Sequence, residues 1–156
     1  MKLYIGADHR GFELKEGLKK FLVEEEVDFV DVGAETLIDD DDYIDYAVSV
    51  AKPVGVGDVK GEDVGGILIC GSGIGMDMVA NKFRGVRAGL CYSDEHVGMA
   101  RHDDDINVLC LAADYIPLET AIEMVKVFLG TPACEEGHGR HKARVDRVKE
   151  LEEGLV

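Results

Sequence analysis

Short apolar runs alternate along this 156-residue chain with longer stretches in which apolar side chains recur every three or four positions. The short runs are too uniformly apolar to have one wet face, which is typical of strands covered on both sides, and the longer stretches have the period of amphipathic helices. The pattern predicts strands at residues 3–7, 28–32, 66–70, 86–91 and 107–112. It predicts helices at residues 11–25, 44–54, 74–83, 94–101, 117–129 and about 141–152.

This alternation of strands and helices predicts an α/β fold. Strands that are joined through a helix run parallel, and right-handed crossovers place helices on both faces of the sheet. The expected architecture is a three-layer αβα sandwich of the Rossmann-like, doubly wound kind, with a five-stranded parallel sheet and a C-terminal helix. Because the length suits one hydrophobic core, we expect residues 1–156 to form a single domain. Ligands of such folds bind beyond the carboxyl ends of the strands.

The charge balance narrows the range of partners. Seventeen basic residues against 32 acidic ones give a formal net charge of -15, so we expect neither nucleic acid nor an anionic membrane surface as a partner. The chain begins on a predicted strand without a basic and apolar leader, and no apolar stretch approaches the roughly 20 residues that span a bilayer. We therefore expect a cytoplasmic protein. The acidic runs at residues 39–42 and 103–105 are interpreted as solvated loops.

The four cysteines show no CxxC spacing. A chain without a leader stays in a reducing compartment, so we expect neither disulfides nor a bound metal. Cys91 and Cys110 lie in apolar runs and are expected to be small core residues, whereas Cys134 lies in a loop-like segment and receives no role. Cys70 differs from these three because of the residues that follow it.

At Cys70 an apolar run ends and continues into Gly71-Ser72-Gly73-Ile74-Gly75, which opens a helical pattern. Glycines let backbone N–H groups approach a ligand closely, and the N-terminus of the following helix adds a partial positive charge, so such a turn stabilises a thiolate or a bound anion. A dinucleotide fingerprint would need glycine where Met76 stands, and the Gly-Lys-Ser/Thr ending of a nucleotide-binding P-loop is missing. A sugar enediolate or a phosphate fits the turn.

Other polar side chains follow the predicted strands. Asp8 and His9 come after the first strand, Tyr43 lies in the loop after the second, and Asp94 and His96 follow the fourth. Together with a thiol and amide donors, this set suits proton transfer next to a carbonyl, in which one group removes a carbon-bound proton and oriented donors hold the developing oxyanion.

His102 precedes the fifth strand and is expected at the opposite edge of the sheet, far from Cys70 within one subunit. A second subunit would be needed to bring these two side chains together. Near the end of the chain, Arg140 and Arg144 are four residues apart on one helical face, a spacing that makes a good phosphate clamp.

Each of these residues also has a purely structural interpretation. Asp8 suits a helix N-cap, and Tyr43 suits packing under a loop. His102 among aspartates suits a solvated cation at a helix end, and the two arginines suit the decoration of a helix surface. Cys70 on its own suits a buried strand end, and only its glycine-rich context favours a catalyst.

Taken in order along nearly the whole chain, these residues resemble the ribose-5-phosphate isomerase B family, which includes the subunits of galactose-6-phosphate isomerase. The matching motifs are Asp8-His9-x-Gly11-Phe12, Asp42-Tyr43, Cys70-Gly71-Ser72-Gly73-Ile74-Gly75, Ala80-Asn81-Lys82-Phe83, Gly85-Val86-Arg87-Ala88, the segment 102–107, and Gly139-Arg140-His141 with Arg144.

The resemblance implies an aldose-ketose isomerase for a phosphorylated sugar, without metal or cofactor, whose sites are shared between subunits of a homodimer or tetramer. Cys70 would be the base that moves a proton between C1 and C2, and Ser72 would assist at the sugar oxygens. His102 of the partner subunit would help to open the sugar ring. Met76 stands where a branch without the cysteine has a glutamate base, which agrees with Cys70 in that role.

The resemblance also assigns binding roles. The amides of Gly71, Gly73 and Gly75 would cradle the enediolate, and Asn81 would support the turn. Asp8 and Tyr43 would orient hydroxyls or the ring oxygen. The phosphate would be held by His9, Arg140 and Arg144.

At two positions the charge of the side chain differs from the one usual in the family. Asp103 stands where an asparagine contacts sugar hydroxyls, and Asp114 stands where an arginine helps to bind phosphate. A carboxylate accepts hydrogen bonds and repels phosphate, so the second change reverses the local preference. Arg10 or Arg101 would restore a positive charge if its side chain reached the site.

Three functions remain open from the sequence. The first is isomerisation of a pentose or hexose phosphate, motivated by Cys70 and its turn. The second is the same reaction on a different, shorter or less charged sugar, motivated by Asp103 and Asp114. The third is a sugar-phosphate-binding subunit without turnover, motivated by the altered His102-Asp103 pair.

Overall fold

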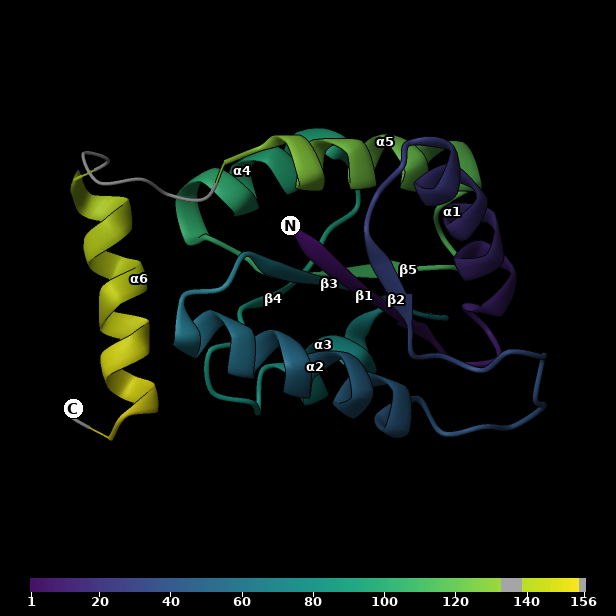
Figure 1. Cartoon of the computed structure of the whole chain (residues 1–156), viewed down its shortest axis with the longest axis horizontal. Helices are drawn as coiled ribbons and strands as arrows, with labels where there is room; N and C mark the ends of the chain where they lie inside the picture. The colour runs from purple at the N-terminus through teal and green to yellow at the C-terminus, as the bar shows by residue number, and fades with distance from the viewer. Residues whose placement is uncertain (133–138, 155–156) are drawn as a thin grey trace.

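A computed structural model describes residues 1–132 and 139–154, and its centre is a parallel sheet of five strands in the order β2-β1-β3-β5-β4 (Figure 1). The strands are β1 (Lys2–Ala7), β2 (Phe29–Asp31), β3 (Val64–Cys70), β4 (Ala88–Leu90) and β5 (Val108–Ala112). The helices are α1 (Phe12–Glu24), α2 (Tyr43–Lys60), α3 (Ile74–Ala80), α4 (Asp94–Asp104), α5 (Leu118–Gly130) and α6 (Gly139–Glu152). The predicted α/β sandwich with a C-terminal helix is confirmed.

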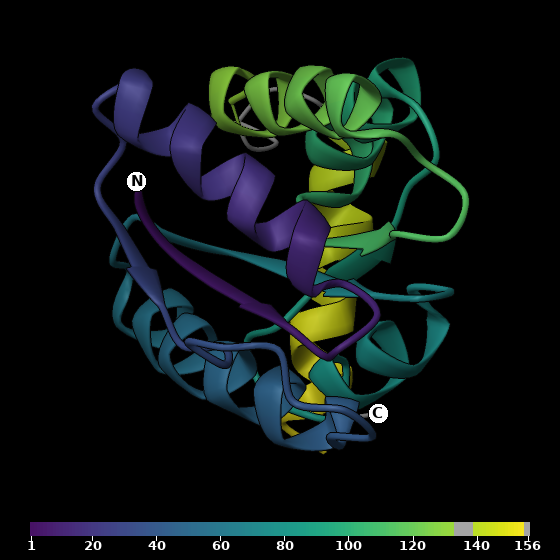
Figure 2. The same cartoon turned by 90° about the vertical axis from the view of Figure 1, so that its right-hand side faces the viewer.

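The helices form two layers around the sheet. Helices α1, α4 and α5 cover one face, and α2 with α3 covers the other, as the two views at right angles show (Figures 1 and 2). Each face has its own core, because residues such as Ile67 and Leu68 alternate between the two sides of β3. The uniformly apolar strands are thus explained: all residues of β5 are buried.

Helix α6 stands apart from both layers and runs across one end of the sandwich (Figure 1). It contacts α4, and its C-terminal end bonds to the connection between α3 and β4, where the N–H of Gly85 donates to Glu152 at 2.9 Å. Its Val145 is buried, whereas Val148 and Leu151 are exposed. The helix therefore covers little of the subunit's own core.

Helix α2 is longer than predicted. The sequence pattern ends the helix at Val54, because Pro53 lacks an N–H donor and glycines follow it, but the helix continues to Lys60. Packing explains the difference. A Cβ atom at Gly55 would lie 2.4 Å from the carbonyl oxygen of Arg84, so the glycine lets α2 approach the loop before β4, and the contact outweighs local helix propensity.

The acidic runs are not simply solvated loops, and that interpretation is wrong for several of their members. The carboxylate of Asp42 accepts the N–H of Ile44 and caps α2, while Asp103 and Asp104 belong to α4. Asp105 ends α4 in a left-handed conformation and binds Arg87. Cys91 and Cys110 are buried as predicted. Within residues 1–132 and 139–154, no helix combines the length and apolarity that a membrane crossing requires.

Candidate active site

The site begins where three central strands end side by side. Ala7 of β1 pairs with Ile69 of β3, and Cys70 pairs with Ala112 of β5. Beyond these pairs, the N–H of Asp114 donates to the carbonyl oxygen of Gly71 at 3.1 Å. Because β1, β3 and β5 are neighbours in the sheet, the turns that follow them form one continuous edge.

Cys70 lies at the end of β3, directly before the glycine turn. The residue is 5% exposed, and its Sγ accepts the N–H of Gly73 at 3.2 Å. The Oγ of Ser72 accepts the N–H of Ile74 at 3.3 Å, in the first turn of α3. The sulfur thus has a main-chain donor beside it, and such a donor binds a thiolate more strongly than a thiol. The predicted juxtaposition of thiol and amides is present.

Two glycines of the turn are required by its shape. Gly73 has a φ of +75°, in the left-handed region, and a Cβ atom there would lie 2.4 Å from Cδ1 of Leu90. A Cβ atom at Gly75 would lie 2.8 Å from Cε2 and Cζ of Tyr43. The Tyr43 ring therefore rests on the first turn of α3, which brings the predicted Tyr43 to the Cys70 turn.

Asp8 follows β1 and is 6% exposed. Burial raises the pKa of its carboxyl group, while the N–H of Gly11, which donates to Oδ1 at 2.9 Å, and the neighbouring His9 oppose the shift. Gly11 is the N-cap residue of α1 and has no side-chain cap, so the N-cap role considered for Asp8 is wrong. The Asp8 carboxylate instead closes the turn before the helix, and its role at the site stays a prediction.

His9 is fixed by a residue that the sequence interpretation did not select. Both its backbone N–H and its ring Nδ1–H donate to Oδ1 of Asp41, at 2.7 Å and 2.8 Å. The hydrogen bond to Asp41 raises the pKa of His9 against the opposing effect of burial. The Asp41 side chain is 8% exposed, so this carboxylate is largely shielded from water. Only the strand order could have indicated Asp41, because the loop after β2 passes the end of the adjacent β1.

Arg10 and Arg101 were the two arginines that could supply the positive charge absent at Asp114, and of these two only Arg10 reaches this edge. Its guanidinium group lies against Gly71, where a Cβ atom would be 2.3 Å from Cζ, and it pairs with the carboxylate of Asp114. Arg101 instead is buried under α5, with its guanidinium over the ring of Phe128.

The remaining predicted residues gather elsewhere. The Nδ1–H of His102, in the last turn of α4, donates to Oδ1 of Asp103 at 2.7 Å, and His141 of α6 places its Nδ1 3.6 Å from the same oxygen. The hydrogen bond from His102 lowers the pKa of Asp103, and the charges of His141 and Arg140 act in the same direction. Asp103 therefore holds an imidazole, and the sugar contact expected of it stays a prediction.

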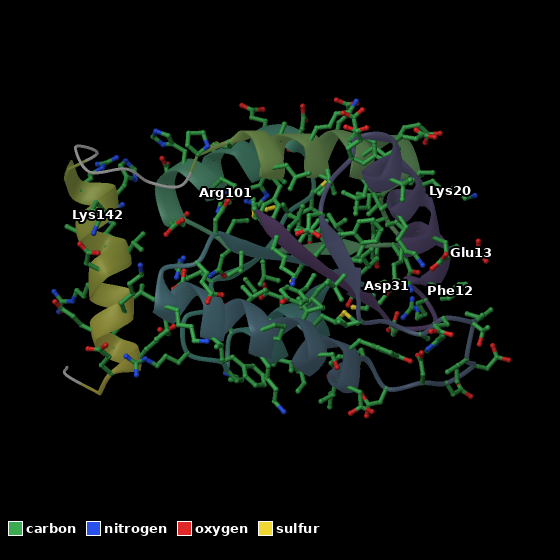
Figure 3. All side chains as sticks on the ribbon, viewed as in Figure 1. Phe12, Glu13, Lys20, Asp31, Arg101 and Lys142 are labelled. Atoms are coloured by element: carbon green, nitrogen blue, oxygen red, sulfur yellow. The ribbon has the colours of Figure 1, made fainter. Side chains whose placement is uncertain are left out.

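The predicted residues thus form two groups at opposite edges of the sheet. His102 precedes β5, whose first residue, Val108, pairs with Gly66 of β3. Cys70, at the other end of β3, pairs with Ala112. Four strand residues, about 13 Å, therefore separate the two edges. Figure 3 shows the same separation between the labelled Phe12, near the first group, and Lys142, near the second.

Arg144 belongs to the second group. It lines a cavity of about 510 Å³ between α6 and the start of β4, together with apolar residues such as Ile106 and Val148. Cys70 does not line this cavity. Because the lining is mainly apolar and contains no nucleophile, the cavity is a weaker candidate for the active site than the glycine turn.

Asn81 bonds to both main-chain groups of Ala88, at the far end of α3 from the glycine turn. It therefore supports the connection from α3 to β4 and not the turn itself. No three His, Cys, Asp or Glu side chains are grouped to hold a metal ion in the part of the chain that the structure describes. Cys134 lies outside the described residues.

Comparisons with known proteins agree with this arrangement. Residues 3–148 match the family model described as Ribose/Galactose Isomerase. Ribose-5-phosphate isomerase B of Escherichia coli strain K12 is 40% identical over 152 residues, which cover 97% of each chain.

Solved structures are similar throughout their length. Ribose-5-phosphate isomerase B of Mycoplasma genitalium, determined with bound ribulose 5-phosphate, has a TM-score of 0.88 and 36% identity, covering 97% of this chain and 96% of that one. The Clostridium thermocellum enzyme of the same name has a TM-score of 0.89 and 33% identity, covering 100% of both chains. The glycine turn with its cysteine, the fold and these matches lead to one conclusion: this chain belongs to the ribose/galactose isomerase family.

Proposed function

We propose that this chain is an aldose-ketose isomerase that interconverts ribose 5-phosphate and ribulose 5-phosphate, with Cys70 as the base. The observation that carries the proposal is the position of the Cys70 sulfur, which accepts the Gly73 N–H at the carboxyl end of β3, directly before the first turn of α3. The activity named for the relatives supports the substrate.

The reaction requires the transfer of one proton between neighbouring carbons. The Cys70 thiolate removes the proton from C2 of the open-chain aldose, the electron pair of that C–H bond forms the C1–C2 double bond, and the carbonyl π pair moves to O1 as the enediolate oxyanion. A proton then passes from the O2 hydroxyl to O1, and the Cys70 thiol returns its proton to C1 as the C2 carbonyl of the ketose forms. Amides of Gly71, Gly73 and Gly75 stabilise the oxyanion, and Ser72 donates to a sugar oxygen.

The ring-opening and phosphate-binding groups come from two subunits. Asp8 and Tyr43 orient the sugar beside Cys70, and His9 binds the phosphate as a cation. His102, Asp103, Arg140 and Arg144 lie too far from the Cys70 of their own chain, so they act at the site of the partner subunit in a homodimer or a larger assembly of such dimers. The exposed apolar side of α6 supports such an assembly.

Within the partner's site, the dyad of His102 and Asp103 has a defined chemical role. Because the Asp103 carboxylate holds Nδ1–H, the His102 imidazole has a fixed orientation. It exchanges a proton with the ring oxygen as the sugar opens, and the Asp103 carboxylate stabilises the imidazolium form.

Isomerisation by the purified chain tests the proposal. Wild-type protein is expected to interconvert the two sugar phosphates unaided and to incorporate deuterium from heavy water at C1 or C2. In Cys70→Ala, kcat should fall by roughly 10³-fold or more, since the proposed base for the carbon-bound proton is lost.

The matched control is Cys91→Ala, which removes a buried thiol from the other face of the sheet and should retain activity. Undiminished exchange in folded Cys70→Ala protein would remove Cys70 from the role of base. Binding of the sugar phosphate without any turnover by the wild-type chain would instead identify a non-catalytic binding subunit.

A further inference from the structure

The edge of the site that should receive a phosphate is crowded with carboxylates. Asp8, Asp41 and Asp114 all lie on the turns that follow the strands, in a chain of net charge -15. An anionic ligand is repelled by such a surface unless a local cation compensates. His9 lies at this edge, and its hydrogen bond to Asp41 raises its pKa, but the same carboxylate offsets the charge of its imidazolium form. Arg140 and Arg144 lie at the opposite edge of this subunit and reach the site only from a partner.

We infer that Arg10, anchored by Asp114, recognises the anionic end of the substrate and sets the preference for phosphorylated over free sugars. The inference rests on the proposed function. It assigns the cation to the turn after β1 and its anchoring carboxylate to the turn after β5.

The position of the guanidinium group is the first argument. Its Cζ, Nε and Nη1 atoms lie over Gly71, so closely that a Cβ atom there would be 2.3 to 2.7 Å from them. Gly71 is the residue directly after Cys70, and its carbonyl oxygen accepts the N–H of Asp114. The missing side chain of Gly71 leaves room for the guanidinium group in this position.

The remaining donors of Arg10 are the second argument. Nη2 binds Asp114, whereas Nε and Nη1 have no hydrogen-bond partner among residues 1–132 and 139–154. A guanidinium group carries five N–H donors in a rigid fork, which matches two oxygens of a phosphate while one amino group stays bound to a carboxylate. The Asp114 carboxylate therefore holds the fork in place beside the glycine turn.

The exposure of the pair is the third argument. The Arg10 side chain is 55% exposed and that of Asp114 is 36% exposed. An ion pair with this much contact with water adds little to stability, because solvent screens it. Folding therefore does not account for the pairing, whereas ligand binding, which excludes water from the guanidinium group, makes its charge effective.

The test compares three variants with wild-type protein. Arg10→Ala removes the cation, and Arg10→Ala/Asp114→Arg returns a cation to the turn after β5. Lys20→Ala is the control, because it removes the same charge from an exposed position on α1 whose side chain points into solvent (Figure 3). Urea unfolding of each variant checks that the fold is intact.

Two readouts separate this inference from the proposed function. Steady-state kinetics with ribose 5-phosphate and with free ribose give kcat and KM, and titration of inorganic phosphate followed by 31P NMR gives a Kd without any reaction. In Arg10→Ala, KM for ribose 5-phosphate and Kd for phosphate should both rise roughly 10- to 100-fold, with kcat within about threefold of wild type. Turnover of free ribose should not change, and the double variant should recover most of the lost affinity.

Arg10→Ala that behaves like Lys20→Ala in both readouts would overturn the role of Arg10 and leave the isomerase proposal intact. If the wild-type chain isomerises neither sugar, the proposed function fails, and the phosphate titration alone decides about Arg10. Weaker phosphate binding in Arg10→Ala would then support an anion site. Equal binding, or no binding by wild-type protein at millimolar phosphate, would refute it.

Discussion

At the scale of single residues, the site depends on small side chains and on carboxylates that hold cations. Gly71 leaves room for a guanidinium group, and Gly73 adopts a left-handed φ that opens α3. Asp41, Asp103 and Asp114 each accept a hydrogen bond from a basic side chain of the proposed site. In an acidic chain, these pairs fix where positive charge is available to a ligand.

One such pair gives a prediction about pH. Asp41→Asn keeps an oxygen that accepts both His9 hydrogen bonds but removes the carboxylate charge, so the pKa of His9 should fall toward its ordinary value near 6.5. Binding of sugar phosphate by the His9 cation should then be lost at a lower pH than in wild type. NMR titration of the His9 ring, together with KM measured against pH, checks the shift.

The raised pKa of His9 also makes the stability of the fold depend on pH. Because the folded-state pKa of His9 is raised, its contribution to stability is complete below pH 6.5 and disappears as the pH rises through the folded value. Asp39→Asn, in the same loop, is the control and should leave the His9 titration nearly unchanged. A titration unaffected by Asp41→Asn would show that another group sets it.

At the scale of secondary-structure elements, buried ion pairs connect helices to strands. Lys15 of α1 is fully buried, and its Nζ donates to Asp31 at the end of β2, at 2.7 Å, and to the carbonyl oxygen of Ala34. Asp31 also accepts the N–H of Gly33 at 2.9 Å. The arrangement fixes the start of the loop that carries Asp41 to the site. The sequence pattern did not single out Lys15, because a lysine is ordinarily expected on the solvent-facing side of a helix and not on its apolar face.

Asp31→Asn should destabilise the fold by about 2–3 kcal/mol, because it leaves the buried Lys15 ammonium with Glu16 and one carbonyl as partners. Burial alone would raise the pKa of Asp31, but hydrogen bonds from Lys15 and Lys19 lower it. The stabilisation is therefore present above pH 4, the unfolded value, and is lost as the pH falls through the lower folded value.

Urea unfolding at pH 7 and near pH 3 measures this difference. Asp28→Asn, which alters an exposed carboxylate just before the same strand, is the matched control and should change stability by less than about 0.5 kcal/mol. Equal stability of the two variants at pH 7 would contradict the structural role of the Lys15 pair.

At the scale of the whole molecule, the two groups of site residues lie at opposite edges of the sheet, and the proposed function joins them through a second subunit. Cys70→Ala and His102→Ala should each be nearly inactive as pure proteins. After mixing in equal amounts and subunit exchange, hybrid dimers carry one site with both side chains intact. Roughly a quarter of the wild-type activity should then return, since about half of the dimers are hybrids with one of two sites restored.

Native mass spectrometry of the mixture provides the control, because it counts the hybrid dimers directly. Hybrids that form without any recovery of activity would show that His102 does not act at the partner's Cys70. A Cys70→Ala variant mixed with Cys91→Ala distinguishes true complementation from simple dilution, since no new site is assembled in that mixture.

The sequence by itself determined the class of fold, because periods of apolar residues specify which segments are helices and which are strands buried on both faces. It also located the thiol of Cys70 beside backbone amides, since a thiol followed by closely spaced glycines allows few backbone paths. It could not give the extent of α2 past Pro53, because Gly55 acts through a contact with a distant loop.

Only the tertiary structure decided which residues meet. The order β2-β1-β3-β5-β4 places Asp8, Cys70 and Asp114 on adjacent strand ends, and strand order depends on long-range packing that no local pattern encodes. The partners of His9 and Arg10 lie 32 and 104 residues away along the chain. Hydrogen bonds and ion pairs act over a few ångströms in space, so the charges that a ligand meets are set by the fold and not by neighbours in sequence.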